Sequence, residues 1–304
     1  MKIFVSGAAG FIGGAIARHA AATHEAYGGV RRRQELGPGI KPVITGDLAE
    51  TRFGLPEVDI VIHAAGLGHK RGVSRAIWQR QNVDAAVNLA RAARLVEARR
   101  FILVSTAYVH GRVHQGLVSD DTAPAPMDEY AQSKLDAEQA VIAAFGPGVT
   151  ILRPTAVIGP GCPGNIQLLV KLLRRGIPLP FASLTNKRGF IPVDDLAALA
   201  LAVAQAETRP PMVLAAHPET ISTPALIRAL AAGLNLPARL FPCPAALLGL
   251  AASLLGRGAM WQSLSGNFET APRAALALGW KPADSLVDSL MATSRYHNTT
   301  AQTP

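Results

Sequence analysis

A strand, a glycine turn and a helix follow one another at the N-terminus, an order that few folds accommodate. Lys2–Ser6 is a short apolar run, glycines follow at positions 7, 10 and 13, and a helical pattern continues through Ala22. Such a turn lets backbone N–H groups and the helix N-terminus approach a pyrophosphate, and its third glycine lets the helix pack against the strand. The sequence therefore predicts a phosphate-binding turn in a parallel α/β sheet. Its expected cofactor-binding residues are Gly7, Gly10, Phe11, Ile12 and Gly13.

Three consecutive arginines follow the second expected strand, Glu25–Val30. A chain that binds NAD commonly has a carboxylate at that place, which hydrogen-bonds the ribose hydroxyls. Guanidinium groups instead attract a 2′-phosphate. We therefore expect NADP(H) as the favoured cofactor, with Arg31 or Arg32 as the contact, and NAD(H) as the alternative. A solvated basic loop is the other interpretation of this cluster.

Two further strand ends carry candidate cofactor contacts. Asp47 and Leu48 follow the strand-like stretch PVIT, and the turn HAAG closes the stretch at 59–63. Ligands of parallel sheets lie beyond the carboxyl ends of the strands. We expect Asp47 to accept a hydrogen bond from an adenine amino group and His63 to be a packed residue. The residues expected beside the cofactor are Asp47, Leu48, Ala64, Ala65 and Gly66.

Tyr130 and Lys134 stand at i and i+4 of a helical segment, so their side chains project from one face. A free tyrosine holds its proton until about pH 10, but a neighbouring ammonium group favours the phenolate. Tyr130 is therefore the expected acid/base and Lys134 the group that tunes it. Thr106 follows the expected strand Arg100–Val104, where its hydroxyl could bond the substrate oxygen that Tyr130 protonates.

Several segments, in this order, resemble the extended short-chain dehydrogenase/reductase family, which contains nucleotide-sugar epimerases and dehydratases. They are GAAGFIG, HAAG, STAYVHG, YAQSK, LRPTAVIGPG and RGFIPVDDL. The resemblance implies an α/β fold with a doubly wound parallel sheet (a Rossmann fold), a smaller C-terminal substrate lobe and a homodimer paired through the helices that include Tyr130. It also implies a catalytic group of Asn82, Thr106, Tyr130 and Lys134. Pro192 departs from the family, which commonly has histidine there.

The domain organisation follows from this resemblance. We expect a cofactor domain over residues 1–160, joined again by 188–206, and a substrate lobe over 161–187 and 207–293. Residues 294–304 lack apolar periodicity and are expected to be a mobile tail. By the resemblance, Asn165, Lys187 and Arg188 bind a nucleotide sugar, and Arg188 suits its diphosphate because a guanidinium can donate two parallel hydrogen bonds. A surface position is the alternative for each.

Reactions of this family share hydride transfer at C4 of a sugar. The dehydratases add an Asp-Glu pair directly after the strand-end hydroxyl residue, where this chain has Ala107 and Tyr108. Dehydration is therefore disfavoured. The arginine cluster favours a 4-keto-sugar reductase that uses NADPH, and a 4-epimerase that retains its cofactor is the alternative. Weaker patterns resemble reductases and epimerases of bacterial surface-polysaccharide sugars. An NADP-binding sensor or scaffold is the alternative from another class, although it would not need Thr106, Tyr130 and Lys134.

The composition limits which other classes of protein this chain can belong to. A hydrophobic content of 49% with 17% charged residues suits a globular protein with a sizeable core. The net charge of +9 is scattered and only seven of the thirty basic residues are lysines, so we expect no nucleic-acid partner. Cys162 and Cys243 indicate neither a disulfide framework nor a metal site, and without a visible leader we expect a cytoplasmic protein. The apolar stretch 244–256 is shorter than the about twenty residues of a membrane span, so none is expected.

Overall fold

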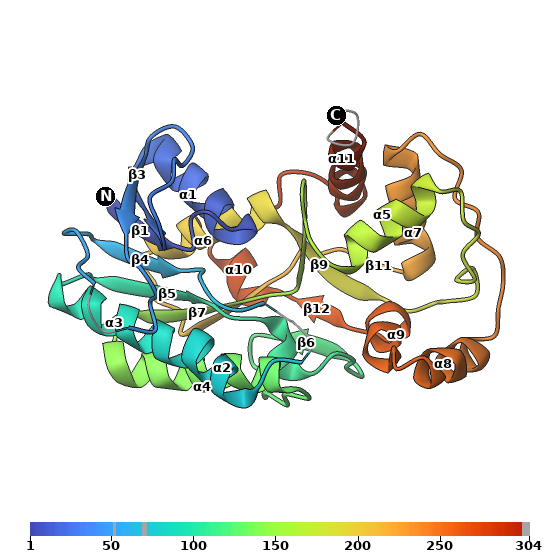
Figure 1. The fold of residues 1–304 in the computed structure, drawn as a ribbon, viewed down its shortest axis with the longest axis horizontal. Coiled ribbons are helices and arrows are strands. Elements are labelled where there is room, and N and C mark those ends of the chain that lie inside the picture. The colour runs from blue at the N-terminus through green and yellow to red at the C-terminus, as the bar shows by residue number, and fades with distance from the viewer. Residues whose placement is uncertain (51–52, 69–71, 300–304) are drawn as a thin grey trace.

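The computed structural model describes residues 1–50, 53–68 and 72–299. A larger sheet-based part and a smaller, mainly helical lobe lie beside one another (Figure 1). The larger part is a seven-stranded sheet of order β10-β7-β5-β4-β1-β2-β3, in which all neighbours are parallel. Its strands are β1 (Lys2–Ser6), β2 (Glu25–Val30), β3 (Ile40–Ile44), β4 (Ile60–His63), β5 (Arg100–Val104), β7 (Val149–Pro154) and β10 (Met212–Ala215).

The strand order reverses between β1 and β4. The chain builds β2 and β3 on one side of β1, and β4, β5, β7 and β10 on the other. This confirms the predicted doubly wound α/β fold. Ser6, at the end of β1, pairs with His63, at the end of β4, so the turns that follow the two strands lie next to each other. Ligands of doubly wound sheets bind at such a reversal point.

Helices cover both faces of this sheet. The helices α1 (Phe11–Thr23) and α6 (Val193–Gln205) lie on one face, and α3 (Ala85–Leu95) and α4 (Glu129–Phe145) on the other (Figure 1). Alternate strand residues point to opposite faces, so Ile60 and Ile62 join the core beneath α1 and α6, whereas Val61 joins the core beneath α3 and α4. Because both faces are covered, the strands read as continuous apolar runs rather than as alternating ones.

The long helical segment over 75–95 contains a change of helix type. It begins with α2 (Arg75–Trp78), continues through the π-helical η1 (Gln79–Asp84) and ends with α3. A π-helical turn inserts one residue into the helical repeat, and such turns are frequent at functional sites. The short 3₁₀ helix η2 (Ala107–His110) follows β5 and is capped by Thr106.

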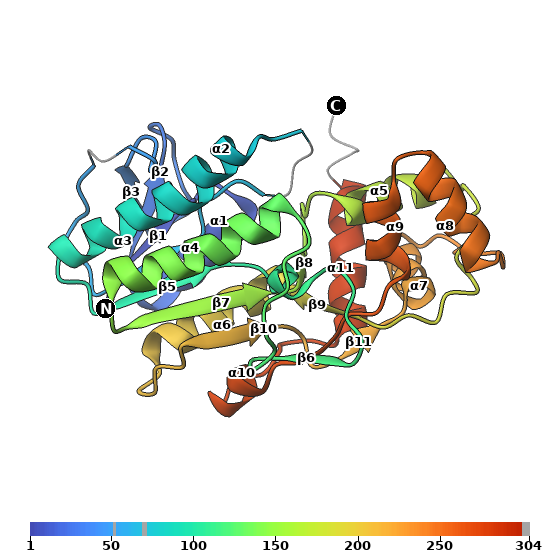
Figure 2. The same ribbon diagram turned by 90° about the horizontal axis from the view of Figure 1, so that it is seen from below.

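The smaller lobe stands beyond the carboxyl ends of the large sheet. Two small sheets, of order β11-β9-β8 and β12-β6, connect it to the larger part (Figures 1 and 2). Their strands are β6 (Leu117–Ser119), β8 (Ala156–Ile158), β9 (Arg188–Pro192), β11 (Thr220–Ile221) and β12 (Glu269–Ala271). The remaining helices are α5 (Asn165–Arg174), α7 (Thr223–Gly233), α8 (Ala245–Leu254), α9 (Gly258–Ser265), α10 (Arg273–Ala277) and α11 (Leu286–Thr299).

The structure differs from the predicted boundaries in three places. Met212–Ala215, predicted to belong to the substrate lobe, forms the edge strand β10 of the large sheet, because its short apolar run is buried beside β7. Arg188–Pro192, predicted to return to the cofactor domain, forms β9 of a small sheet, and only α6 after it packs on α1. Residues 294–299, predicted to belong to a mobile tail, continue α11, and residues 300–304 lie outside the described residues.

Small polar residues explain why apolar periodicity does not predict the last part of α11. Thr293 and Ser294 are fully buried, and their hydroxyls donate to backbone carbonyls one turn earlier in the same helix. Helix α11 packs on α7 at Gly233, where an added Cβ would collide with Ser294. Small residues thus permit a close helix contact that an apolar periodicity does not reveal.

Candidate active site

The glycine turn after β1 is a backbone cradle. Gly7 has a φ of 69°, and a Cβ there would lie 2.9 Å from Cα of Ala65 in the neighbouring turn. A Cβ at Gly13 would collide with the carbonyl of Gly7, so glycine lets α1 approach β1 closely. Gly10 caps α1 without a side chain, and the first turn of the helix, which includes Phe11, carries no carboxylate. The turn therefore fits a dinucleotide pyrophosphate, which favours a positively polarised helix N-terminus.

Ser6 holds the two neighbouring turns together. Its hydroxyl bonds Nδ1 of His63 at 2.7 Å and accepts from the backbone N–H groups of Ala64 and Ala65, each at 3.1 Å. Burial, and then the charge of Lys134, lower the pKa of His63 to about 3, so its ring is neutral. His63 is 1% exposed, which confirms that it is a packed residue. The sequence did not single out Ser6.

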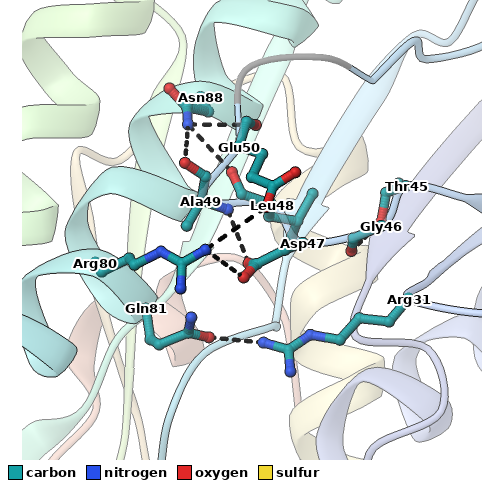
Figure 3. A network of polar contacts seen from close by, with 10 residues as sticks. All are labelled: Arg31, Thr45, Gly46, Asp47, Leu48, Ala49, Glu50, Arg80, Gln81 and Asn88. Carbon is teal, nitrogen blue, oxygen red and sulfur yellow. Dashed lines mark hydrogen bonds and ion pairs between the residues drawn. The ribbon is translucent and has the colours of Figure 1, made fainter.

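A polar network stands where β2 and β3 end (Figure 3). Arg31 donates to the side chain of Gln81 at 2.6 Å, and Arg80 donates to the Asp47 carboxylate at 2.9 Å. The other oxygen of Asp47 accepts from the N–H of Ala49 at 3.1 Å. The structure thus brings the predicted residues Arg31 and Asp47 together, and adds two polar partners from η1 that sequence patterns did not reveal.

Asn82 links the turn after β4 to helix α4. Its Oδ1 accepts from the N–H of Leu67 at 2.8 Å, and its Nδ2 donates to the Ser133 hydroxyl at 2.9 Å. Gly66, with a φ of 151°, would place a Cβ 3.1 Å from Oδ1 of Asn82. Asn82 is buried and bonded on both ends of its amide, so it ties Leu67, directly after the turn at 64–66, to the helix of Tyr130.

Thr106 and Tyr130 meet above the carboxyl end of β5. Burial raises the pKa of Tyr130 to about 12, and a side-chain hydrogen bond with Thr106 acts in the opposite direction. The Thr106 hydroxyl also accepts from the N–H of Tyr108 at 3.2 Å. The ring of Trp78 lies 5.6 Å from that of Tyr130, measured between ring centroids. Trp78 was not predicted, and no spacing in the sequence joins it to this site.

Lys134 is buried and bonds to the end of β5. Its ammonium donates to the carbonyl of Val104 at 2.8 Å, and burial lowers its pKa to about 8, against an opposing effect of Glu138. Burial of the phenol has the largest effect on the pKa of Tyr130 and raises it. The expectation that Lys134 lowers this pKa stays a prediction.

A buried ion pair supports the helix of Tyr130 and Lys134. Arg153 donates to both oxygens of Glu138, at 3.0 Å through Nε and at 2.5 Å through Nη2, and Ser105 donates to the same carboxylate. The other terminal nitrogen of Arg153 lies 3.2 Å from Nε2 of His110. Ser105, His110 and Glu138 lie near Thr106 or Lys134 in the sequence, but only the structure shows that they form one network with Arg153.

The substrate-lobe candidates have different surroundings. Asn165 is exposed at the start of α5, and Lys187 is exposed and 3.5 Å from the Glu269 carboxylate. Arg188 is 5% exposed, and its Nη1 donates to the carbonyl of Gly266 at 3.0 Å. Two more carbonyls accept from that nitrogen, and the guanidinium lies over the ring of Phe268 at 5.9 Å. Arg188 thus has a structural task, and its predicted diphosphate contact stays a prediction.

Asp128 is a residue of this region that the sequence did not indicate. Its carboxylate caps α4 by accepting from the N–H of Ala131 at 2.8 Å and pairs with the buried Arg112 at 2.5 Å. It therefore fixes the start of the helix that carries Tyr130. Within the described part of the chain, no group of three or more His, Cys, Asp or Glu is placed to hold a metal ion.

Comparison with known proteins gives three findings. Residues 3–215 match the model of the NAD dependent epimerase/dehydratase family. The chain is 31% identical over 266 residues to a UDP-glucose 4-epimerase of Vibrio cholerae, covering 82% of this chain and 81% of that protein. It is also 31% identical over 174 residues to a GDP-6-deoxy-D-mannose reductase of Pseudomonas aeruginosa, covering 53% of each chain.

The fold has close counterparts among solved structures. One is a UDP-glucuronic acid 4-epimerase from Bacillus cereus in complex with UDP-glucuronic acid and NAD. It has a TM-score of 0.77 and 22% identity, and the match covers 99% of this chain and 100% of that one. This likeness supports the fold.

Proposed function

The chain belongs to the NAD-dependent epimerase/dehydratase family, and we propose that it is an NAD(P)-dependent oxidoreductase acting at C4 of a nucleotide-activated sugar. The observation that carries the proposal is the hydrogen bond between Thr106 and Tyr130 at the carboxyl end of β5. It lies at the sheet edge where the Gly7 turn forms its cradle.

Within this proposal each residue has a separate task. Tyr130 exchanges a proton with the sugar hydroxyl or carbonyl oxygen, and Thr106 donates a hydrogen bond that orients the same group. Asn82 holds Leu67, directly after the turn at 64–66, against α4. Lys134 places a positive charge at the end of β5, available to the ribose hydroxyls of a dinucleotide. A bound nicotinamide would supply the hydride acceptor or donor.

We further propose that the net reaction is the reduction of a 4-keto sugar by NADPH. Arg31 and Arg32 are exposed after β2, where an NAD-binding chain commonly has a carboxylate. Their guanidinium groups can bind a 2′-phosphate. The nearby Asp47 carboxylate is paired with Arg80. An exchangeable NADPH supports a reductase better than an enzyme that recycles one cofactor.

A 4-epimerase with retained NAD is the second candidate. Its support is the 31% identity to the UDP-glucose 4-epimerase of Vibrio cholerae over 82% of this chain. Both reactions move a hydride at C4, and Tyr130 would give a proton to or take one from the C4 oxygen. The reductase reduces a ketone with NADPH and then exchanges its cofactor. The epimerase oxidises C4 with bound NAD and returns the hydride to the opposite face of the same sugar.

The proposal also covers how the nucleotide sugar is bound, what the product is used for, and how the protein assembles. Asn165, Lys187 and Arg188 would bind the nucleotide and its phosphates in the lobe, and the product would serve the synthesis of a polysaccharide in the cytoplasm. We propose a homodimer that pairs through α4. The domain assignment, with the cofactor on the large sheet and the sugar against the lobe, belongs to the same proposal.

Incubating the purified protein with 4-keto nucleotide sugars and NADPH, and separately with nucleotide sugars alone, distinguishes the candidates. Oxidation of NADPH in proportion to the ketone consumed supports the reductase. Interconversion of two C4 epimers without consumption of added cofactor supports the epimerase. Cofactor binding with no turnover of any nucleotide sugar would leave the sensor or scaffold interpretation in place of an enzyme.

A further inference from the structure

Helix α8 presents an apolar face to solvent. Its sequence, AALLGLAASL, contains no charge, and none of its residues is buried. Leu247 and Leu250 are each 59% exposed and Leu254 is 80% exposed, at positions i, i+3 and i+7 that share one helix face. The following Leu255 is 73% exposed.

The opposite side of α8 is anchored to the lobe. Gly249 lies against the Trp261 ring of α9, where an added Cβ would stand 3.0 Å from the indole nitrogen. The two helices form a hairpin on the side of the lobe away from α11 (Figure 1). The exposed leucines therefore lie on a helix that packs against α9, not on a chain terminus.

The lobe around this hairpin has an unusual charge pattern. The chain contains 21 Asp and Glu residues, yet residues 161–187 and 220–268 contain none. These two segments supply most of the formal net charge of +9. Their basic residues are all exposed: Lys171, Arg174, Arg175, Lys187, Arg228, Arg239 and Arg257.

The anionic substrate of the proposed function accounts for only part of this charge. Lys187 and the buried Arg188 stand by the small sheets that join the two parts of the protein. Arg257 instead immediately precedes α9 within the hairpin, and Arg239 lies in the segment that leads into α8, 3.5 Å from the carbonyl of Gly176. Basic groups therefore accompany the apolar face itself.

We propose that α8 and its basic surroundings form a docking surface for a bilayer of anionic phospholipids. An apolar helix face flanked by arginines lies in the plane of an interface, with its leucines among the acyl chains and its cations at the headgroups. Each leucine removed from the interface weakens binding, and so does salt. No helix formed by the described residues is long and apolar enough to cross a membrane, so the contact is peripheral.

The experiment measures co-sedimentation of the full chain with two kinds of vesicle, phosphatidylcholine alone and phosphatidylcholine mixed with phosphatidylglycerol. The test variant is Leu250→Glu plus Leu254→Glu on α8. The matched control is Leu95→Glu, which alters an 86% exposed leucine at the end of α3, outside the lobe. All three positions are exposed, so the variants should fold, and near-ultraviolet circular dichroism checks this.

We expect the wild type to bind the mixed vesicles, more weakly as salt rises, and to bind phosphatidylcholine at least about tenfold less. The α8 variant should lose binding to the mixed vesicles by about tenfold or more, and Leu95→Glu should bind as the wild type does.

Absence of wild-type binding overturns the proposal, and so does equal loss in both variants. If the wild type ignores vesicles but sediments as an oligomer that the α8 variant dissociates, a second copy of the chain covers α8 and the proposal is wrong. None of these readouts depends on turnover, so they stand or fall separately from the proposed reaction.

Discussion

Removal of one partner of the buried ion pair between Glu138 and Arg153 should destabilise the fold severely. The two side chains are 4% and 9% exposed, and two hydrogen bonds of 3.0 and 2.5 Å join them. Glu138→Leu leaves a buried guanidinium unpaired and Arg153→Met leaves a buried carboxylate, each of which costs about 3 to 5 kcal/mol. We expect each single substitution to lower the free energy of unfolding by that amount.

The double variant separates the unpaired charge from the lost volume. With both charges replaced by apolar side chains, no buried ion is left alone, and we expect a free energy of unfolding within about 2 kcal/mol of the wild type. The assay is urea unfolding followed by tryptophan fluorescence. Arg99→Met serves as the control, because Arg99 pairs with Asp59 at the surface, with side chains 64% and 33% exposed, and should cost less than about 1 kcal/mol. Costs of the two single substitutions that simply add in the double variant would refute the reasoning.

The same substitution reports on the active site. Glu138 raises the pKa of Lys134, against the larger effect of burial that lowers it to about 8. Glu138→Leu should therefore move the pKa of Lys134 below its wild-type value, and a limb of the pH–rate profile that follows Lys134 should move to lower pH. A profile that does not move would show that Lys134 does not titrate in turnover.

Three further predictions concern Tyr130, the pair Arg31 and Arg32, and His63. Tyr130→Phe should keep the fold and cofactor binding but lower turnover by about 10² to 10⁴-fold, measured on the sugar that the substrate screen identifies; near wild-type turnover would remove Tyr130 from catalysis. Arg31→Ala plus Arg32→Ala should weaken NADP(H) by roughly tenfold to over a hundredfold and leave NAD(H) unchanged, as titration of both cofactors would show, and equal wild-type affinities would contradict the preference. Burial holds the pKa of His63 at about 3 in the folded chain, below its ordinary value of 6.5. The unfolded chain therefore binds more protons in that window, and stability should fall by roughly 1.4 kcal/mol per pH unit as the pH drops through it. His63→Gln should flatten this dependence in urea unfolding at successive pH values, and an unchanged slope would assign the acid sensitivity to other groups.

The sequence by itself determined the features that depend on residues close together along the chain. Gly7 and Gly13 stand where a side chain would clash with the backbone of a neighbouring turn, and glycine at such a spacing is visible in the sequence. The run Arg100–Val104 forms β5 as predicted, because apolar residues in a short run suit a strand that is buried on both faces. The meeting of Thr106 and Tyr130 also followed from local signals, namely a strand end and a helix in a doubly wound order.

Only the tertiary structure decided what depends on burial and on partners distant in the chain. The sequence does not show whether Arg188 is buried or exposed. In the fold its guanidinium is buried and donates to carbonyls of loops far from it along the chain. Lys134 shares a helix face with Tyr130, yet the carbonyl of Val104 and the burial of both side chains set its direction and the two pKa values. The strand β10 and the end of α11 were missed for a related reason, since a short run or a stripe of small residues becomes an element only against the surface it packs on. Periodicity records which face of a segment is apolar, whereas the charge state and the partner of a polar group depend on the dielectric surroundings that the whole fold creates.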